Sequence, residues 1–186
     1  MKHNLVRQTI VETASRLFYE NGYNLTGINE IIKEAGIAKA TLYNHFRSKE
    51  EICIAYLHYK DQVFFEQLKA FLNTYPKGKK RVVGLFDFLT KFYEGDNFNG
   101  CWCLNTVSEI PKENEQIRKV IQDGKEVLIN YIEELVGDSL ELDKEGIKVI
   151  AKQIYLLYEG GLSESHLHQD VWPIKTAYSL CEKLIA

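Results

Sequence analysis

The chain has 186 residues, 45% of them hydrophobic, which is enough for one sizeable domain or for a small domain joined to a larger one. No apolar run approaches the roughly 18 residues of a membrane span, and the charged, amphipathic N-terminus lacks the apolar core of a signal peptide, so we expect a cytoplasmic protein with no membrane partner. The net charge of −3 argues against a protein that binds nucleic acid with its whole surface.

The charge is unevenly distributed along the chain. Residues 1–50 contain seven Lys or Arg and five Asp or Glu, a net charge of +2, whereas the remaining 136 residues have a net charge of −5. A basic N-terminal part on an acidic body suits a protein that meets a polyanion with one end only.

The first 50 residues have the pattern of three short helical segments. Apolar residues recur at steps of three and four, which predicts a first helix over residues 1–21. Thr26 is expected to cap a second helix that Gly36 ends, and a third helix is expected within IAKATLYNHF, residues 37–46. Two short helices joined by a tight turn at residues 35–37 predict a helix-turn-helix inside a three-helix bundle.

The third of these helices carries side chains that suit a DNA duplex. Lysine reaches guanine or phosphate, threonine reaches phosphate or a thymine methyl, and tyrosine and asparagine reach phosphates or base edges. These residues are Lys39, Thr41, Tyr43 and Asn44. Leu42 and Phe46 are expected in the core, and His45 either contacts DNA or hydrogen-bonds within the bundle.

Helical patterns continue to the end of the chain. Ser48 and Glu51 form a capping box, which predicts a long helix to about Tyr75. Further helices are expected over 79–94, 101–109, 113–136, 144–168 and 173–185. We therefore predict an all-α fold of about nine helices, with a helix-turn-helix DNA-binding domain over 1–47 and a larger helical regulatory domain, for ligand binding and dimerisation, over 48–186.

The segment TGINEIIKEAGIAKATLYNHFRSKEE, residues 26–51, resembles the DNA-binding segment of the TetR family of bacterial transcriptional repressors. The similarity extends back through the first helix and covers about 50 residues, and it implies an all-helical homodimer, a palindromic double-stranded DNA operator and a signal site in the C-terminal body. By position it implies DNA contacts; these are Thr26, Lys39, Thr41, Tyr43, His45 and Lys49. Ala40 stands where many members have Gly or a polar residue, which removes one base contact.

Two C-terminal segments, 144–168 and 173–185, carry apolar stripes at three- and four-residue spacing. Such stripes are either core within one chain or a dimer face. The resemblance favours a dimer in which these two helices of each subunit form a four-helix bundle, with Ile154 on the shared face.

The stretch GCWCLN, residues 100–105, holds two of the four cysteines, all of which are expected to be reduced. A C-x-C pair without a second Cys/His pair does not predict zinc, and no metal or cofactor is expected. Cys101 falls at the expected start of a helix, where free amides stabilise a thiolate. The pattern F98-N-G-C101 is similar to one in some TetR-like regulators, a subset of which sense electrophiles or oxidants with that cysteine; the alternative is a small buried residue at a helix start.

Aromatic residues are frequent in the middle of the chain, and some of them can line an apolar cavity for an effector. The expected sensing or ligand-binding set is Cys101, Trp102, Phe98, Phe92 and Tyr155. The sequence thus predicts a TetR-like regulator that binds its operator as a homodimer and is released by a small apolar or electrophilic effector or by thiol modification. Two alternatives remain open, namely a helix-turn-helix adaptor regulated by a protein partner and a cysteine-dependent enzyme; we expect no enzyme, because no histidine lies near Cys101 in sequence.

Overall fold

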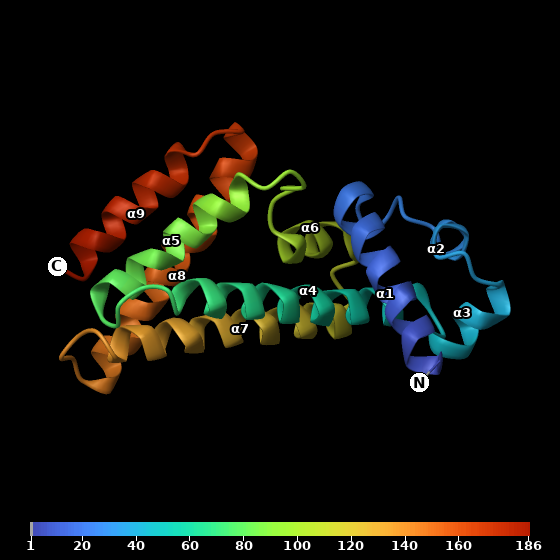
Figure 1. Ribbon diagram of the computed structural model, residues 1–186, viewed down its shortest axis with the longest axis horizontal. Coiled ribbons are helices and arrows are strands. Elements are labelled where there is room, and N and C mark those ends of the chain that lie inside the picture. Colours follow the sequence, from blue (N-terminus) through green and yellow to red (C-terminus); the bar gives the residue numbers. More distant parts are fainter. Residues whose placement is uncertain (1) are drawn as a thin grey trace. The chain divides into compact units, whose positions relative to one another are not determined.

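The computed structural model describes residues 2–186, with side chains described from Asn4 onward, and all the regular structure in that part of the chain is α-helical (Figure 1). The nine helices described are α1 (Lys2–Asn21), α2 (Ile28–Glu34), α3 (Lys39–His45), α4 (Lys49–Leu72), α5 (Lys79–Tyr93), α6 (Trp102–Glu109), α7 (Glu115–Gly137), α8 (Lys144–His168) and α9 (Trp172–Leu184). The all-α prediction is confirmed, and each predicted helix is found within a few residues of its expected bounds.

The start of α4 follows the predicted capping box with one change. The Glu51 amide donates to Ser48 Oγ at 3.1 Å, as expected. The Glu51 carboxylate, expected to accept from the Ser48 amide, accepts from the Arg47 amide at 2.7 Å instead. The box therefore reaches one residue further back and ties α4 to the end of the helix-turn-helix.

The chain divides into two compact units. Unit 1 comprises the chain through Phe64 together with Trp102–Gly124, and unit 2 comprises Phe65–Cys101 and Lys125–Ala186. We expected a division after residue 47, with all later helices in one body. Here α6 and the first part of α7 group with the helix-turn-helix, and the functional boundary after residue 47 stays a prediction. The chain passes from one unit to the other after Phe64, after Cys101 and after Gly124.

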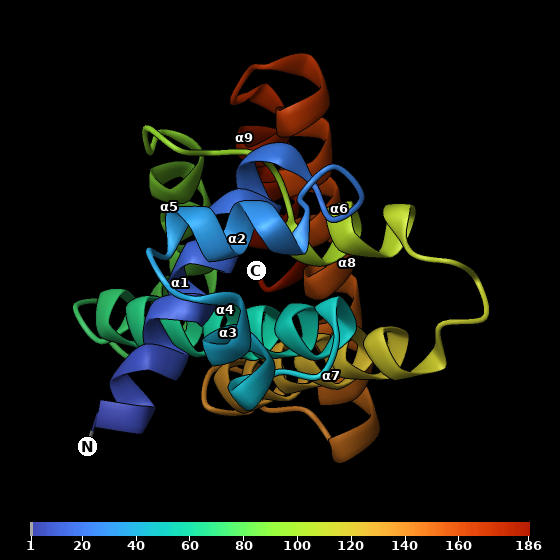
Figure 2. The same cartoon turned by 90° about the vertical axis from the view of Figure 1, so that its right-hand side faces the viewer.

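In unit 1, α1 packs on α2 and α2 packs on α3 (Figure 2). Leu42 and Phe46 are buried, as predicted, and Ile31 of α2 is wholly buried with them. The Arg7 guanidinium lies 4.9 Å from the centre of the Phe46 ring, which adds a cation–π contact at the edge of the bundle.

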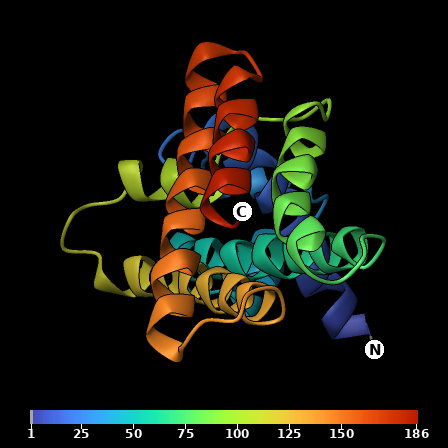
Figure 3. The same ribbon diagram turned by 90° about the vertical axis from the view of Figure 1, so that its left-hand side faces the viewer.

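In unit 2, α5, α8 and α9 pack side by side (Figure 3). Their shared core contains the predicted stripes, through Ile154 and Tyr158 on α8 and through Ile174 and Cys181 on α9. Ile154 has no exposed surface within a single chain, so placing it on a dimer face was wrong: that stripe is the core of one subunit. None of the described helices combines the length and apolarity needed to cross a membrane.

Candidate functional site

The exposed face of α3 is the first candidate surface (Figure 2). Lys39, Tyr43 and Asn44 are exposed and Thr41 is half-buried, whereas Leu42 points into the core. This division follows from the helical period, because positions 39 and 43 are one turn apart and share a face. The structure thus presents on one short helix the four polar side chains that sequence reasoning selected there.

Thr26 does not lie at this surface. It is completely buried, and its hydroxyl donates to the carbonyls of Leu17 and Gly22 at 3.1 Å and 2.8 Å. Gly27, not Thr26, is the N-cap of α2. This corrects the expectation that Thr26 caps α2 and offers its hydroxyl to a phosphate, because the hydroxyl is already engaged inside the bundle.

The two remaining predicted DNA contacts lie at the ends of helices. His45 is half-buried as the last residue of α3. Lys49 begins α4, and its ammonium lies 3.5 Å from the Asn24 carbonyl oxygen and 4.4 Å from the centre of the Tyr23 ring. Burial lowers the pKa of Lys49. The Lys49 side chain is therefore held by the loop between α1 and α2.

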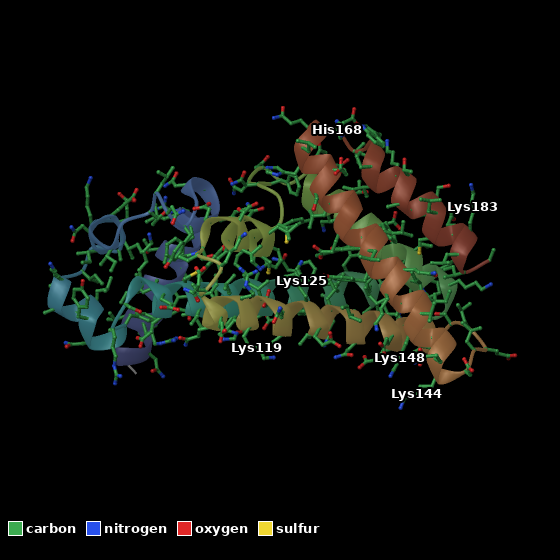
Figure 4. The ribbon with its side chains drawn as sticks, turned by 180° about the vertical axis from the view of Figure 1, so that it is seen from behind. Lys119, Lys125, Lys144, Lys148, His168 and Lys183 are labelled. Carbon is green, nitrogen blue, oxygen red and sulfur yellow. The ribbon has the colours of Figure 1, made fainter. Side chains whose placement is uncertain are left out.

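Cys101 is the centre of the second candidate site and lies between two opposite charges in unit 2. Lys125 Nζ of α7 is 3.3 Å from Cys101 Sγ, and Glu159 Oε2 of α8 is 4.0 Å from the same sulfur. Lys125 and Glu159 also pair with each other at 2.6 Å, with side chains only 18% and 14% exposed. Figure 4 shows Lys125 on α7, projecting from a different side of the helix than Lys119.

Both neighbours act on the charge of the Cys101 thiol. The Lys125 ammonium favours the thiolate form, whereas the Glu159 carboxylate, which accepts a hydrogen bond from the thiol, disfavours it. In contrast, burial raises the pKa of Cys53 and of Cys181 to about 12, so both remain thiols at neutral pH. Cys101 is itself only 4% exposed, in keeping with the alternative of a small buried residue at a helix start, so we expect only small reagents to reach the sulfur.

Tyr158 adds a hydroxyl beside this cluster. Its side chain is fully buried, and its hydroxyl has no hydrogen-bond partner in the described part of the chain. Burial raises the pKa of Tyr158, with the Glu159 carboxylate adding to the rise. The group therefore stays neutral and is a hydrogen-bond donor in the interior of unit 2.

The loop before Cys101 is fixed by packing against the end of α8. Gly100 has φ +73°, and a Cβ atom there would lie 2.7 Å from His166 Nδ1. The Phe98 ring packs edge-on against Phe92 and against His166, with centroids 5.6 Å and 5.7 Å apart. Only glycine satisfies both the backbone angle and the space at position 100.

Replacement of Gly100 by alanine should therefore destabilise unit 2 by about 1–3 kcal/mol, because it adds a left-handed backbone penalty to a clash with an imidazole ring. Chemical denaturation would measure the loss. Gly137→Ala is the matched control, since its Cβ would meet only ordinary van der Waals contact with Ile147 at 3.6 Å. Equal stability of the two variants would contradict this account of the loop.

The other residues of the predicted sensing set are divided between the two units. Phe92 and Phe98 are in contact, but Trp102 belongs to unit 1, where its Nε1 donates to Asp61 at 3.1 Å and its ring packs on Phe64. Tyr155 is half-buried on α8, one turn before Glu159.

Sequence reasoning missed three residues of the Cys101 site: Lys125, Glu159 and His166. Lys125 and Glu159 are 24 and 58 residues from Cys101 along the chain, and no local pattern marks either of them. Among the described residues, no cluster of three or more His, Cys, Asp or Glu is arranged to hold a metal ion.

Comparison with known proteins gives consistent matches. Residues 10–56 match the family described as bacterial regulatory proteins, tetR family. The chain is 24% identical over 148 residues to the fatty acid metabolism regulator protein of Bacillus subtilis, covering 78% of this chain and 75% of that protein. It is 22% identical over 190 residues to the HTH-type transcriptional repressor NemR of Escherichia coli, covering 97% and 94%.

Solved structures share the fold over nearly the whole chain. The reduced form of Escherichia coli NemR superposes with a TM-score of 0.87 at 20% identity, covering 97% of each chain. A TetR-family transcriptional regulator from Streptomyces coelicolor superposes with a TM-score of 0.86 at 24% identity, covering 97% of this chain and 88% of that one.

Proposed function

Because this chain belongs to the TetR family and is a transcriptional regulator, we propose that it represses transcription by binding a palindromic operator as a homodimer and that modification of Cys101 releases it. The contact between Lys125 and Cys101 is the observation that supports this mode of release. We further propose that it works in the cytoplasm, where the thiol is reduced at rest.

The α3 surface supports the DNA-binding part of the proposal. Lys39, Tyr43 and Asn44 project from a short helix whose other side is buried, which suits insertion into a major groove. His45 and Lys49 flank this helix, and we assign them contacts to the phosphate backbone. One such helix contacts few base pairs, so useful specificity requires two copies about 34–36 Å apart, or a multiple of that spacing.

The side of α8 that faces away from the core supports the dimer. Val149, Leu156 and Leu167 are 45%, 68% and 72% exposed, and the helical period places them on one line with Gly160, opposite Ile154. A Cβ on Gly160 would meet nothing within 4 Å, so a second helix can approach closely there. On α9, Trp172 and Leu180 are also exposed, and the two helices together form an apolar face that suits a second copy.

The surroundings of Cys101 support release by thiol chemistry. A small electrophile or oxidant that adds to the sulfur breaks its contact with Lys125 and puts new bulk at the start of α6. The NemR structure that shares this fold is described as a reduced form, so a redox state is a property of that protein. A non-covalent effector among Phe92, Phe98 and Tyr155 is the alternative if thiol reagents have no effect on DNA binding.

The DNA-binding proposal is tested by comparing Lys39→Ala with Lys144→Ala on operator and random duplexes. Loss of a base-reading lysine should cost about 1–3 kcal/mol at the operator and lower the ratio of operator to random affinity. Lys144→Ala, which removes an exposed lysine at the start of α8, should change neither affinity.

Binding of the wild-type protein should also weaken steeply as salt rises, through counterion release. If Lys39→Ala retains the wild-type ratio of operator to random affinity, its assignment to base reading is wrong. A protein that binds the operator but responds to no thiol reagent or small molecule would instead fit the adaptor alternative.

A further inference from the structure

An exposed arginine follows the end of α3 in unit 1. The chain leaves the helix at Phe46 in an extended conformation, with φ −141° and ψ 126°, and the Phe46 side chain is buried. Successive side chains of an extended chain point to opposite sides, so the burial of Phe46 directs Arg47 outward, where it is exposed. Arg47 therefore adds a guanidinium group at the end of the helix that carries the candidate DNA-binding surface.

The main chain at Arg47 is fixed by hydrogen bonds to the start of α4. The Arg47 amide donates to Glu51 Oε2 at 2.7 Å, and the Glu51 amide donates to Ser48 Oγ at 3.1 Å. The backbone that carries the Arg47 side chain is therefore ordered before any ligand binds. A contact made by this guanidinium costs the ordering of the side chain alone, which favours binding.

Arg7 of α1 brings a second guanidinium group to the end of α3. Its Cζ atom lies 4.9 Å from the centre of the Phe46 ring, so the ring ties Arg7 to the residue that precedes Arg47. Arg7 is itself exposed. Because an aromatic ring has no oxygen acceptor, the N–H groups of Arg7 remain able to donate to the oxygens of an anion.

The charges of these two arginines are not neutralised within unit 1. Neither guanidinium forms an ion pair with a carboxylate in the part of the chain that the structure describes. Arg16, which also lies on α1, differs in this respect, because its guanidinium pairs with Glu20 at 3.4 Å and with Glu34 at 3.1 Å. Two cations without acidic partners at one end of a helix attract a polyanion.

We propose that Arg7 and Arg47 form an arginine pair that binds phosphate groups of the DNA backbone beside α3. A guanidinium group presents its N–H donors in one plane and can bond two phosphate oxygens at once. This inference rests on the proposed binding of DNA through α3 and adds two backbone contacts to it. Phosphate contacts fix the position of a protein on the duplex and carry no sequence information, so the arginine pair supplies affinity and register, and Lys39 supplies base preference.

The test measures the affinity of full-length protein for two duplexes over a range of KCl concentrations. One duplex is an inverted repeat that the wild-type protein selects from random-sequence DNA, and the other has the same composition in scrambled order. Each phosphate contact contributes about −0.9 to the slope of log K against log salt concentration. The proposed dimer carries each arginine twice, so Arg7→Leu and Arg47→Ala should each make this slope less steep by about 1.8.

The choice of variants separates phosphate binding from a structural role. Leucine at position 7 keeps an apolar side chain against Phe46, and thermal melting checks that each variant is folded. Arg16→Ala is the matched control, since it removes an arginine of the same helix whose charge is already paired, and it should keep the wild-type slope. Arg7→Leu and Arg47→Ala should weaken binding to the two duplexes by the same factor.

The outcomes distinguish the arginine pair from the proposed function. If both arginine variants keep the wild-type slope, the two guanidinium groups do not bind phosphate. A lower ratio of selected to scrambled affinity in these variants would assign the arginines to base reading and overturn the phosphate assignment. If the wild-type protein prefers no selected repeat, yet the slopes on the scrambled duplex change as expected, then the proposed operator-specific repression is wrong and the arginine pair stands.

Discussion

Replacing Leu156 with glutamate should convert the proposed dimer into a folded monomer that no longer binds its operator. Leu156 is 68% exposed in a single chain, so the carboxylate is solvated in the monomer and the fold persists. In a symmetric dimer the residue occurs twice at the interface, and each desolvated carboxylate costs about 2 kcal/mol or more, so the dimer Kd should rise at least about 1000-fold. Light scattering would measure the mass, and a gel shift would measure the loss of operator binding.

Two further variants make this prediction specific. Leu142→Glu makes the same change at a residue 44% exposed in the loop before α8, and should leave a dimer. Ile154→Glu places a carboxylate in the core of a subunit and should unfold unit 2 instead of releasing a folded monomer. A Leu156→Glu protein that stays dimeric would place the interface on another surface.

The helices could be predicted because their signals are local. Gly36 and the Ser48 capping box each act within a few residues, and the predicted bounds came within a few residues of the structure. The buried face of α3 could be predicted for the same reason, because the helical period alone places Leu42 and Phe46 on the inward side.

What could not be predicted depends on contacts between distant segments. Periodicity identified the apolar stripe through Ile154 but could not show which helices cover it. In the structure, α5 and α9 of the same chain cover this stripe, and Leu156 on the other side of α8 is exposed. Thr26 had the sequence of a helix cap, yet its hydroxyl bonds to Leu17, which lies nine residues earlier. The charges around Cys101 come from α7 and α8, so no local pattern could reveal them. From the sequence, the predicted reactivity of this thiol rested only on its place at the start of a helix, and it stays a prediction.

The last prediction concerns the relative reactivity of Cys101, Cys53 and Cys181, because Cys101 lies 3.3 Å from the Lys125 ammonium. Cys101 should be alkylated at least about tenfold faster than Cys53 or Cys181 at neutral pH, because the pKa of each of those two thiols is raised to about 12 and their thiolate fractions are minute. Brief treatment with substoichiometric iodoacetamide, followed by peptide mass spectrometry, would rank the sites. A bulky maleimide should label Cys101 poorly, since the sulfur is almost fully buried.

Lys125→Met should remove the faster alkylation of Cys101. Lys119→Met is the control and should leave that rate unchanged, because Lys119 forms an exposed ion pair with Asp123 on the same helix. The loss of one ammonium at 3.3 Å should lower the labelling rate of Cys101 about tenfold, the effect of one pKa unit, or about 1.4 kcal/mol. Cys101→Ser should keep the operator affinity of the resting protein and lose its release by alkylating agents and oxidants. If Cys101 reacts no faster than Cys181, or if the serine variant is still released, then the thiol is packing at the start of α6 and a non-covalent effector provides the signal.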